Sequence, residues 1–194
     1  MTKNKDYMIH SVRYKAVLDT NVIFPIVIRD LLFWFAHYDL YTPKWSNNIF
    51  DEWKNVMIRK GIEPLIAEKR ITIANTAFPD ALVLNYEGLI ENLNLPDIDD
   101  RHVLAAAIKI NANIIVTNNL KDFPSDYLES FGLKAVSADD FLTDIIDLNH
   151  DTAIKAFKEL VLNRKNPEMD EFQVLESFRR NGLDQTADYL HALL

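Results

Sequence analysis

A short apolar run that ends in polar residues is the clearest pattern in the sequence, and it occurs twice. Residues 14–21 read YKAVLDTN and residues 111–119 read NANIIVTNN. Runs of this length, rich in β-branched residues and followed by Asp, Thr or Asn, are typical of buried strands. Weaker patterns predict further short strands at residues 134–136 and near residues 81–85.

Helical patterns fill the intervals between these runs. The expected helices are one over residues 26–38 after Pro25, one capped by Ser46 that stops near Gly61, one over residues 64–74, a turn before Leu95, one that Asp99 or Asp100 caps and that runs through VLAAAIKI, and one after Ser137. Strands that alternate with helices are typical of a parallel sheet covered on both faces, so the fold class is predicted to be α/β.

The last part of the chain shows helical patterns only. Helices are expected over residues 153–162, over residues 170–180 and from Asp184 onward. We interpret residues 148–194 as a small C-terminal helical extension without catalytic groups, and residues 13–147 as the main domain. A length of 194 residues suits one domain with a modest appendage.

Composition excludes several kinds of chemistry. The chain has no cysteine, which excludes disulfides, thiolate nucleophiles and cysteine-ligated metals. The apolar stretch 22–40 is interrupted by Arg29, Asp30 and Asp39, and the N-terminus has no apolar signal segment, so no membrane span and a cytoplasmic location are expected. A net charge of −8 disfavours a polyanionic partner unless the acids converge on divalent cations.

Polar side chains at strand ends carry the candidate chemistry, because ligands of parallel sheets bind beyond the carboxyl ends of the strands. The residues in question are Asp19 and Asn21 after the first strand, Thr117, Asn118, Asn119 and Asp122 after the later one, Asp100 at a helix start, and Glu52 at the edge of an apolar helix stripe. Oxygen ligands of this kind suit Mg²⁺ or Mn²⁺. The histidines show no paired metal-ligand spacing, and Trp34, Trp45 and Trp53 are interpreted as packing residues.

Four segments resemble PIN domains in order and approximate separation. They are AVLDTN, IFDEW, DIDDRHVLAAAI and NIIVTNNLKDF, and the resemblance covers roughly residues 13–145. The last three segments are most similar to the VapC toxins, and the tail after Leu148 resembles the extension of one VapC-like subgroup. The resemblance implies a three-layer α/β/α fold with a central parallel sheet.

The resemblance also implies a metal-dependent ribonuclease that leaves a 5′-phosphate and attacks structured RNA such as transfer RNA. The implied partners are the RNA and an antitoxin protein, and a dimer of the chain is expected as well. The matching positions are the acids Asp19, Glu52, Asp100 and Asp122, the supporting residues Asn21 and Thr117, and Asp97 as an extra ligand. Many PIN domains have Asp where this chain has Asn119, so Asp122 must supply the fourth carboxylate.

Other interpretations stay open at this point. Taken singly, a strand ending in Asp-Thr-Asn is an ordinary turn, and an Asp before a helix is an ordinary cap. A non-catalytic PIN-like scaffold and a phosphatase acting on small esters are the competing functions. Glu52 either binds the metal through water or orients the attacking water.

Two surface features are also predicted. Basic side chains near the proposed site would line an RNA groove or be solvated charges: Lys54, Arg59, Lys60, Arg101 and Lys121. The helix over residues 26–38 is apolar on more than one face, so it is expected to be enclosed by other elements or by a partner. Its consecutive apolar residues 31–35 cannot all face the sheet, so this helix and a face of the C-terminal helices are expected to form an interface that a dimer or an antitoxin covers.

Overall fold

The computed structural model of the chain describes residues 14–194 and contains a central sheet of short parallel strands. The strands are β1 (Lys15–Leu18), β2 (Thr42–Ser46), β3 (Leu82–Val83), β4 (Ile114–Val116) and β5 (Ala135–Val136). They lie in the order β3-β2-β1-β4-β5, and every neighbouring pair is parallel. The prediction of a parallel α/β sheet is therefore confirmed.

The two strongest sequence patterns form adjacent strands at the centre of the sheet. Ala16 is in register with Ile114, and Leu18 with Val116. The apolar side chains of both strands are fully buried, because a central parallel strand is covered on both faces. The sequence pattern does not predict β2, because Pro43 and Lys44 interrupt its apolar run.

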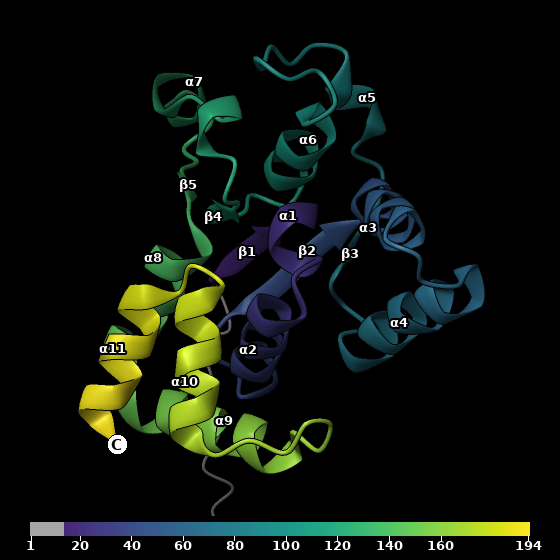
Figure 1. Cartoon of the computed structure of the whole chain (residues 1–194). Helices are drawn as coiled ribbons and strands as arrows, with labels where there is room; N and C mark the ends of the chain where they lie inside the picture. The colour runs from purple at the N-terminus through teal and green to yellow at the C-terminus, as the bar shows by residue number, and fades with distance from the viewer. Residues whose placement is uncertain (1–13) are drawn as a thin grey trace, which may run out of the picture.

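Helices surround this sheet. They are α1 (Thr20–Ile23), α2 (Ile26–His37), α3 (Asn47–Arg59), α4 (Pro64–Ala77), α5 (Glu87–Ile90), α6 (Arg101–Lys109), the 3-10 helix η1 (Leu120–Asp122), α7 (Ser125–Glu129), α8 (Ala138–Leu148), α9 (His150–Asn163), α10 (Glu171–Arg180) and α11 (Asp184–Leu193). α6 packs against β1, β2 and β4, while α2 and α3 pack against β2. Sheet and helices form the expected three-layer α/β/α arrangement, with the C-terminal helices added beside α2 (Figure 1).

Helix ends follow the capping residues of the sequence. The Ser46 hydroxyl accepts a hydrogen bond from the Ile49 amide, and Ser137 caps α8 in the same way. Gly61 follows α3 with a φ of 85°, a left-handed conformation that favours glycine. One predicted cap is wrong: Asp100 occupies the N-cap position of α6, but its side chain makes no capping hydrogen bond.

The C-terminal helices cover much of α2. α2 packs against α9 and α10, and α11 packs against α8 and α10. Leu31, Leu32 and Phe35 are completely buried, whereas Phe33 and Trp34 are partly buried. Enclosure of Leu31, Leu32 and Phe35 by elements of the same chain is therefore confirmed, while the interface expected at the rest of the run stays a prediction.

Among residues 14–194, no helix has both the length and the apolar character needed to cross a membrane. His10 and the proposed domain start at residue 13 lie outside the described residues.

Candidate functional site

The ends of β1 and β4 bring the first group of polar residues together. The Asp19 amide donates to the Val116 carbonyl over 3.1 Å, so Asp19 and Thr117 follow paired positions of adjacent strands. The Thr117 hydroxyl donates to Asp19 Oδ2 over 2.7 Å, and the side-chain amide of Asn21 donates through Nδ2 to the same oxygen. Asp19 Oδ1 accepts from the Thr20 amide. The structure thus unites Asp19, Asn21 and Thr117 as the sequence predicted.

The Asp19 carboxylate is almost completely removed from solvent, with an exposed fraction of 3%. Burial raises its pKa, and the negative charge of Glu52 raises it further, while the hydrogen bonds from Thr117 and Thr20 act in the opposite direction. A buried carboxylate with fixed donors is held in one orientation, which suits a metal ligand or an anchor for one.

A second group of acids lies where the start of α6 approaches η1. One carboxylate oxygen each from Asp97, Asp100 and Asp122 lies within 4.8 Å of the others. Asp97 and Asp100 come from the loop before α6, and Asp122 from the turn after β4. Asp19 is outside this group of three, although its charge acts on Asp100.

Burial and the crowding of these acids together raise the pKa of Asp100. Partial burial and then the charges of Asp19, Asp97, Asp122 and Glu52 raise the pKa of Asp100 from 3.8 to about 7. Acids that repel one another this strongly are stabilised by a cation between them, so the donor set fits a divalent metal with oxygen ligands.

Asn119 lies between two of these carboxylates. Its amide nitrogen donates to Asp122 Oδ2 and lies 3.5 Å from Asp100 Oδ2. At this position the chain therefore supplies a hydrogen-bond donor to the acids instead of a further carboxylate.

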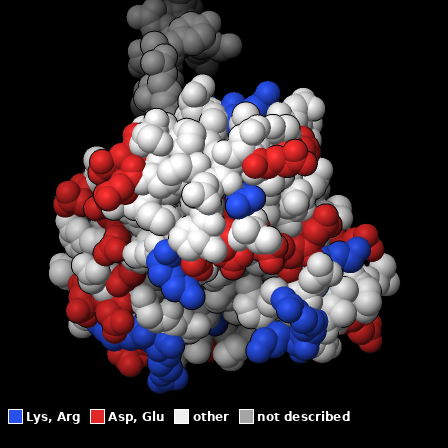
Figure 2. Space-filling model, turned by 90° about the horizontal axis from the view of Figure 1, so that it is seen from above, with Lys and Arg blue, Asp and Glu red and all other residues white. Residues whose placement is uncertain are grey.

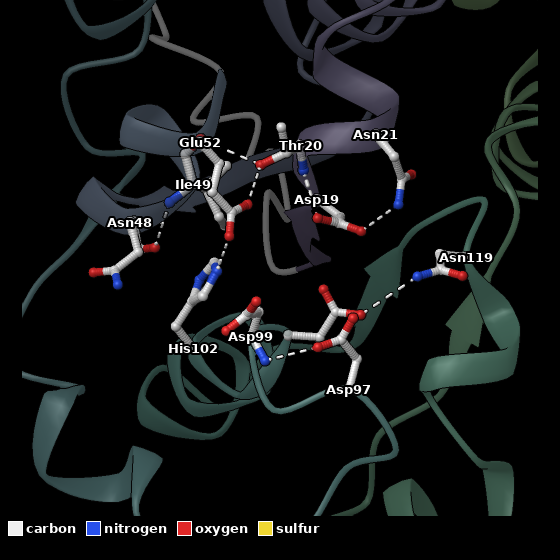
Figure 3. A network of polar contacts seen from close by, with 12 residues as sticks. Asp19, Thr20, Asn21, Asn48, Ile49, Glu52, Asp97, Asp99, His102 and Asn119 are labelled. Carbon is white, nitrogen blue, oxygen red and sulfur yellow. Dashed lines mark hydrogen bonds and ion pairs between the residues drawn. The ribbon is translucent and has the colours of Figure 1, made fainter. Parts of the chain in front are cut away.

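Glu52 reaches the site from α3, and both of its carboxylate oxygens are engaged (Figure 3). The Thr20 hydroxyl donates to Oε2 over 2.6 Å, and His102 Nε2 lies 2.7 Å from Oε1. His102 is buried, with an exposed fraction of 5%, and its Nδ1 is buried without a hydrogen-bond partner in the described residues. These contacts hold Glu52 at the edge of the site.

Thr20 and His102 were not among the predicted site residues. Thr20 lies in the DTN segment, but nothing in the sequence indicates that its hydroxyl meets a residue of α3. His102 follows Asp100 by two positions and lacks a second histidine at metal-ligand spacing, so its spacing does not indicate a site residue. The only sequence signal for it was its place in the DIDDRH segment.

Only some of the basic side chains predicted to line an RNA groove are exposed and unpaired among the described residues. Lys54 forms an ion pair with Glu68 at 3.2 Å, and Lys121 lies 3.9 Å from Asp122 with its side chain 82% exposed. Arg59 and Lys60 are exposed at the end of α3, and Arg101 is half-buried. Figure 2 shows acidic side chains across the middle of one face with separate groups of Lys and Arg beside them.

The other predictions on aromatic residues agree with the structure. Trp45 and Trp53 are buried in the core, and the predicted packing role is confirmed for both. Trp34 is partly buried and packs beside His37 and Tyr38.

Comparisons with known proteins identify two regions of the chain. A family model described as PIN domain matches residues 15–121, which is more than half of the chain. A second model, described as VapC50 C-terminal domain, matches residues 138–192.

One curated relative supports the same relationship. The protein named "Putative ribonuclease VapC50" of Mycobacterium tuberculosis (strain ATCC 25618 / H37Rv) is 45% identical over 85 residues, which cover 44% of this chain and 49% of that protein. The match thus spans about half the length of the curated relative. No solved structure matches the chain. With its central sheet, its acids at the strand ends and the match over residues 15–121, the chain belongs to the PIN domain family, in a VapC-like form with a C-terminal extension.

Proposed function

We propose that this protein is a metal-dependent endoribonuclease that hydrolyses RNA phosphodiester bonds as the toxin of a toxin–antitoxin pair. The observation that carries the proposal is the convergence of Asp97, Asp100 and Asp122 within 4.8 Å, next to the buried Asp19. The PIN-domain match and the ribonuclease name of the relative support the same class of reaction.

Each acid has a distinct part in the proposed site. Asp100 and Asp122 bind Mg²⁺ or Mn²⁺ directly, with Asp97 as an additional ligand. Asp19 completes the site from β1, and Asn21, Thr117 and Asn119 hold the carboxylates in place through their donors. A bound divalent ion would activate a water molecule and offset the charge that develops on the phosphate.

Glu52 has the features of a group that positions water. Its two oxygens accept hydrogen bonds from Thr20 and His102, which leaves each oxygen a further lone pair for a water molecule, and Glu52 stands outside the group of Asp97, Asp100 and Asp122. Of the two roles left open by the sequence, we favour orientation of the attacking water, for which a carboxylate fixed by two neighbours is suited.

The competing functions make different demands on the site. A non-catalytic scaffold is usually recognised by lost carboxylates, and here only Asn119 departs from the acids of many PIN domains, while Asp19, Glu52, Asp100 and Asp122 are all present. A phosphatase for small esters needs a closed pocket, whereas the side chain of Lys121, 3.9 Å from Asp122, is 82% exposed and available to an RNA backbone outside such a pocket. Both features favour a nuclease.

We further propose the biological setting that VapC-like proteins imply. The substrate is a structured RNA such as transfer RNA, the partner is a cognate antitoxin, the chain pairs as a dimer and the location is cytoplasmic. The C-terminal helices from residue 148 form a unit that shapes the partner surface and contributes no catalytic group.

Cleavage of RNA with and without Mn²⁺ tests the proposal. Wild-type protein is expected to cut RNA only when the metal is present, and Asp19→Asn and Asp100→Asn are expected to be inactive. Asp51→Asn is the matched control, because Asp51 is an exposed acid of α3 next to Glu52. Metal-independent cleavage, or full activity of Asp100→Asn, would contradict the proposed chemistry.

A further inference from the structure

A hollow of about 300 Å³ lies beside the acid cluster, and apart from Glu52 and His102 its lining residues have no role in the chemistry described so far. Its lining residues are Asn48, Glu52, Ile90, Ile98, Asp99 and His102. Glu52 lines the hollow and also belongs to the proposed active site, so the hollow lies next to the proposed position of the cleaved phosphate. In Figure 3, Asn48 and His102 lie on the side of Glu52 that faces away from Asp19.

The lining selects against a phosphate group. It contains the carboxylates of Glu52 and Asp99 and neither lysine nor arginine. A phosphate would therefore meet negative charge without a cation to balance it. A neutral group that offers N–H donors fits this lining better, because carboxylates accept hydrogen bonds and donate none when ionised.

The apolar part of the lining favours a flat ring over a sugar. Ile98, which is 64% exposed, and Ile90 both line the hollow and give it an apolar surface. Single-stranded RNA is recognised through splayed bases that pack on side chains and hydrogen-bond through their edges. The hollow has both kinds of contact.

Two polar groups of the lining are free to recognise a base edge. The Asn48 Oδ1 atom accepts from the Tyr86 hydroxyl, and its Nδ2 donates to none of the described residues. Asp99 donates through its backbone to Asp97, while its own carboxylate is not engaged by any described residue. The hollow therefore presents one free carboxylate and one free amide donor.

From this arrangement, and resting on the proposed nuclease function, we infer that the hollow is a base-binding subsite that accepts a guanine next to the cleaved phosphate. Guanine alone among the RNA bases places two N–H donors, N1–H and the N2 amino group, side by side on its Watson–Crick edge, where one carboxylate can accept from both. The Asp99 carboxylate is the acceptor, and the Asn48 amide donates to an acceptor of the base.

Short RNAs with one cut site test the subsite. Wild type is expected to prefer guanine at one position beside the cut, and replacement of that guanine by inosine, which lacks the N2 amino group, is expected to lower kcat/KM by about five- to tenfold, the worth of one hydrogen bond. Asp99→Asn is expected to cut the guanine and inosine RNAs equally well. Asn48→Ala is expected to lower kcat/KM for the guanine RNA by a similar factor and to leave cleavage of an RNA that is abasic at this position unchanged.

Matched controls separate the subsite from the metal site. Asn47→Ala and Asp51→Asn change exposed neighbours on α3 that do not line the hollow, and both are expected to keep the wild-type ratio of guanine to inosine cleavage. Mn²⁺ affinity is expected to stay unchanged in Asn48→Ala. If wild type cuts RNA without regard to the flanking base, or if Asp99→Asn keeps the guanine preference, the subsite is refuted while the nuclease stands. If wild type cuts no RNA, both proposals fall.

Discussion

The carboxylate of Glu52 shows at the scale of single residues what the sequence could and could not predict. Its place among the acids followed from the PIN resemblance. Its hydrogen bonds to Thr20 and His102 did not, because they join residues that are 32 and 50 positions apart. Pattern and spacing describe a local face of a helix, whereas such contacts depend on how elements pack in three dimensions.

Removal of the His102 side chain tests its role as a positioning residue. His102→Ala is expected to lower kcat by about 10- to 100-fold, because Glu52 loses a hydrogen bond that involves a charged group. Mn²⁺ affinity is expected to change little. His102→Gln, which can still donate to Glu52, is expected to recover part of the rate. Equal loss in both variants, together with weaker metal binding, would indicate a structural role instead.

Asp100 predicts how the stability of the metal-free protein depends on pH. Its folded-state pKa of about 7 lies above the ordinary value of 3.8, so the folded protein binds the proton more tightly than the unfolded chain does. Ionisation of Asp100 therefore destabilises the fold, and this loss grows as the pH rises from about 4 to about 7.

Thermal unfolding in EDTA measures this effect. Asp100→Asn is expected to have a higher Tm than wild type at pH 8, and the difference is expected to shrink at pH 5, where the wild-type carboxyl is protonated in the folded state. Added Mn²⁺ is expected to stabilise wild type more than the variant at pH 8. A Tm difference that does not vary between the two pH values would contradict the assigned pKa.

At the scale of elements, the sequence predicted most helices but not which of them would cover one another. The consecutive apolar residues of α2 correctly indicated more than one buried face. The cover is intramolecular, however, because α9 and α10 pack on α2 and leave Leu31, Leu32 and Phe35 without solvent contact. A pattern of apolar positions shows that a face is covered and does not show by what.

The packing of the C-terminal helices predicts a large cost for one core substitution. Phe157 of α9 is completely buried and packs against Phe178 of α10, with ring centroids 5.9 Å apart. Phe157→Ala is expected to lower the free energy of unfolding by about 3–5 kcal/mol, measured by urea denaturation. Phe172→Ala is the control, since Phe172 is 59% exposed, and its expected change is within about 0.5 kcal/mol. Equal effects would contradict the described packing.

At the scale of the whole molecule, the charge of the chain and its proposed substrate are reconciled by the position of the acids. A net charge of −8 opposes RNA binding in general. Part of that charge lies at the ends of β1 and β4 and in the loop before α6, where a divalent ion would reverse the local field. The sequence indicated these acids because parallel strands place their carboxyl ends at one edge, and it missed β2 because Pro43 and Lys44 hide the strand pattern.

Binding of Mn²⁺ tests most directly the claim that these acids form a metal centre. Mn²⁺ is titrated into the metal-free protein and its binding is measured by electron paramagnetic resonance. Wild type is expected to bind the ion, and so is Asp126→Asn, which changes an exposed acid four residues beyond Asp122. Asp122→Asn is expected to bind at least about tenfold more weakly, because it removes a ligand from the group of three. Equal affinities of Asp122→Asn and Asp126→Asn would contradict the metal centre and the function built on it.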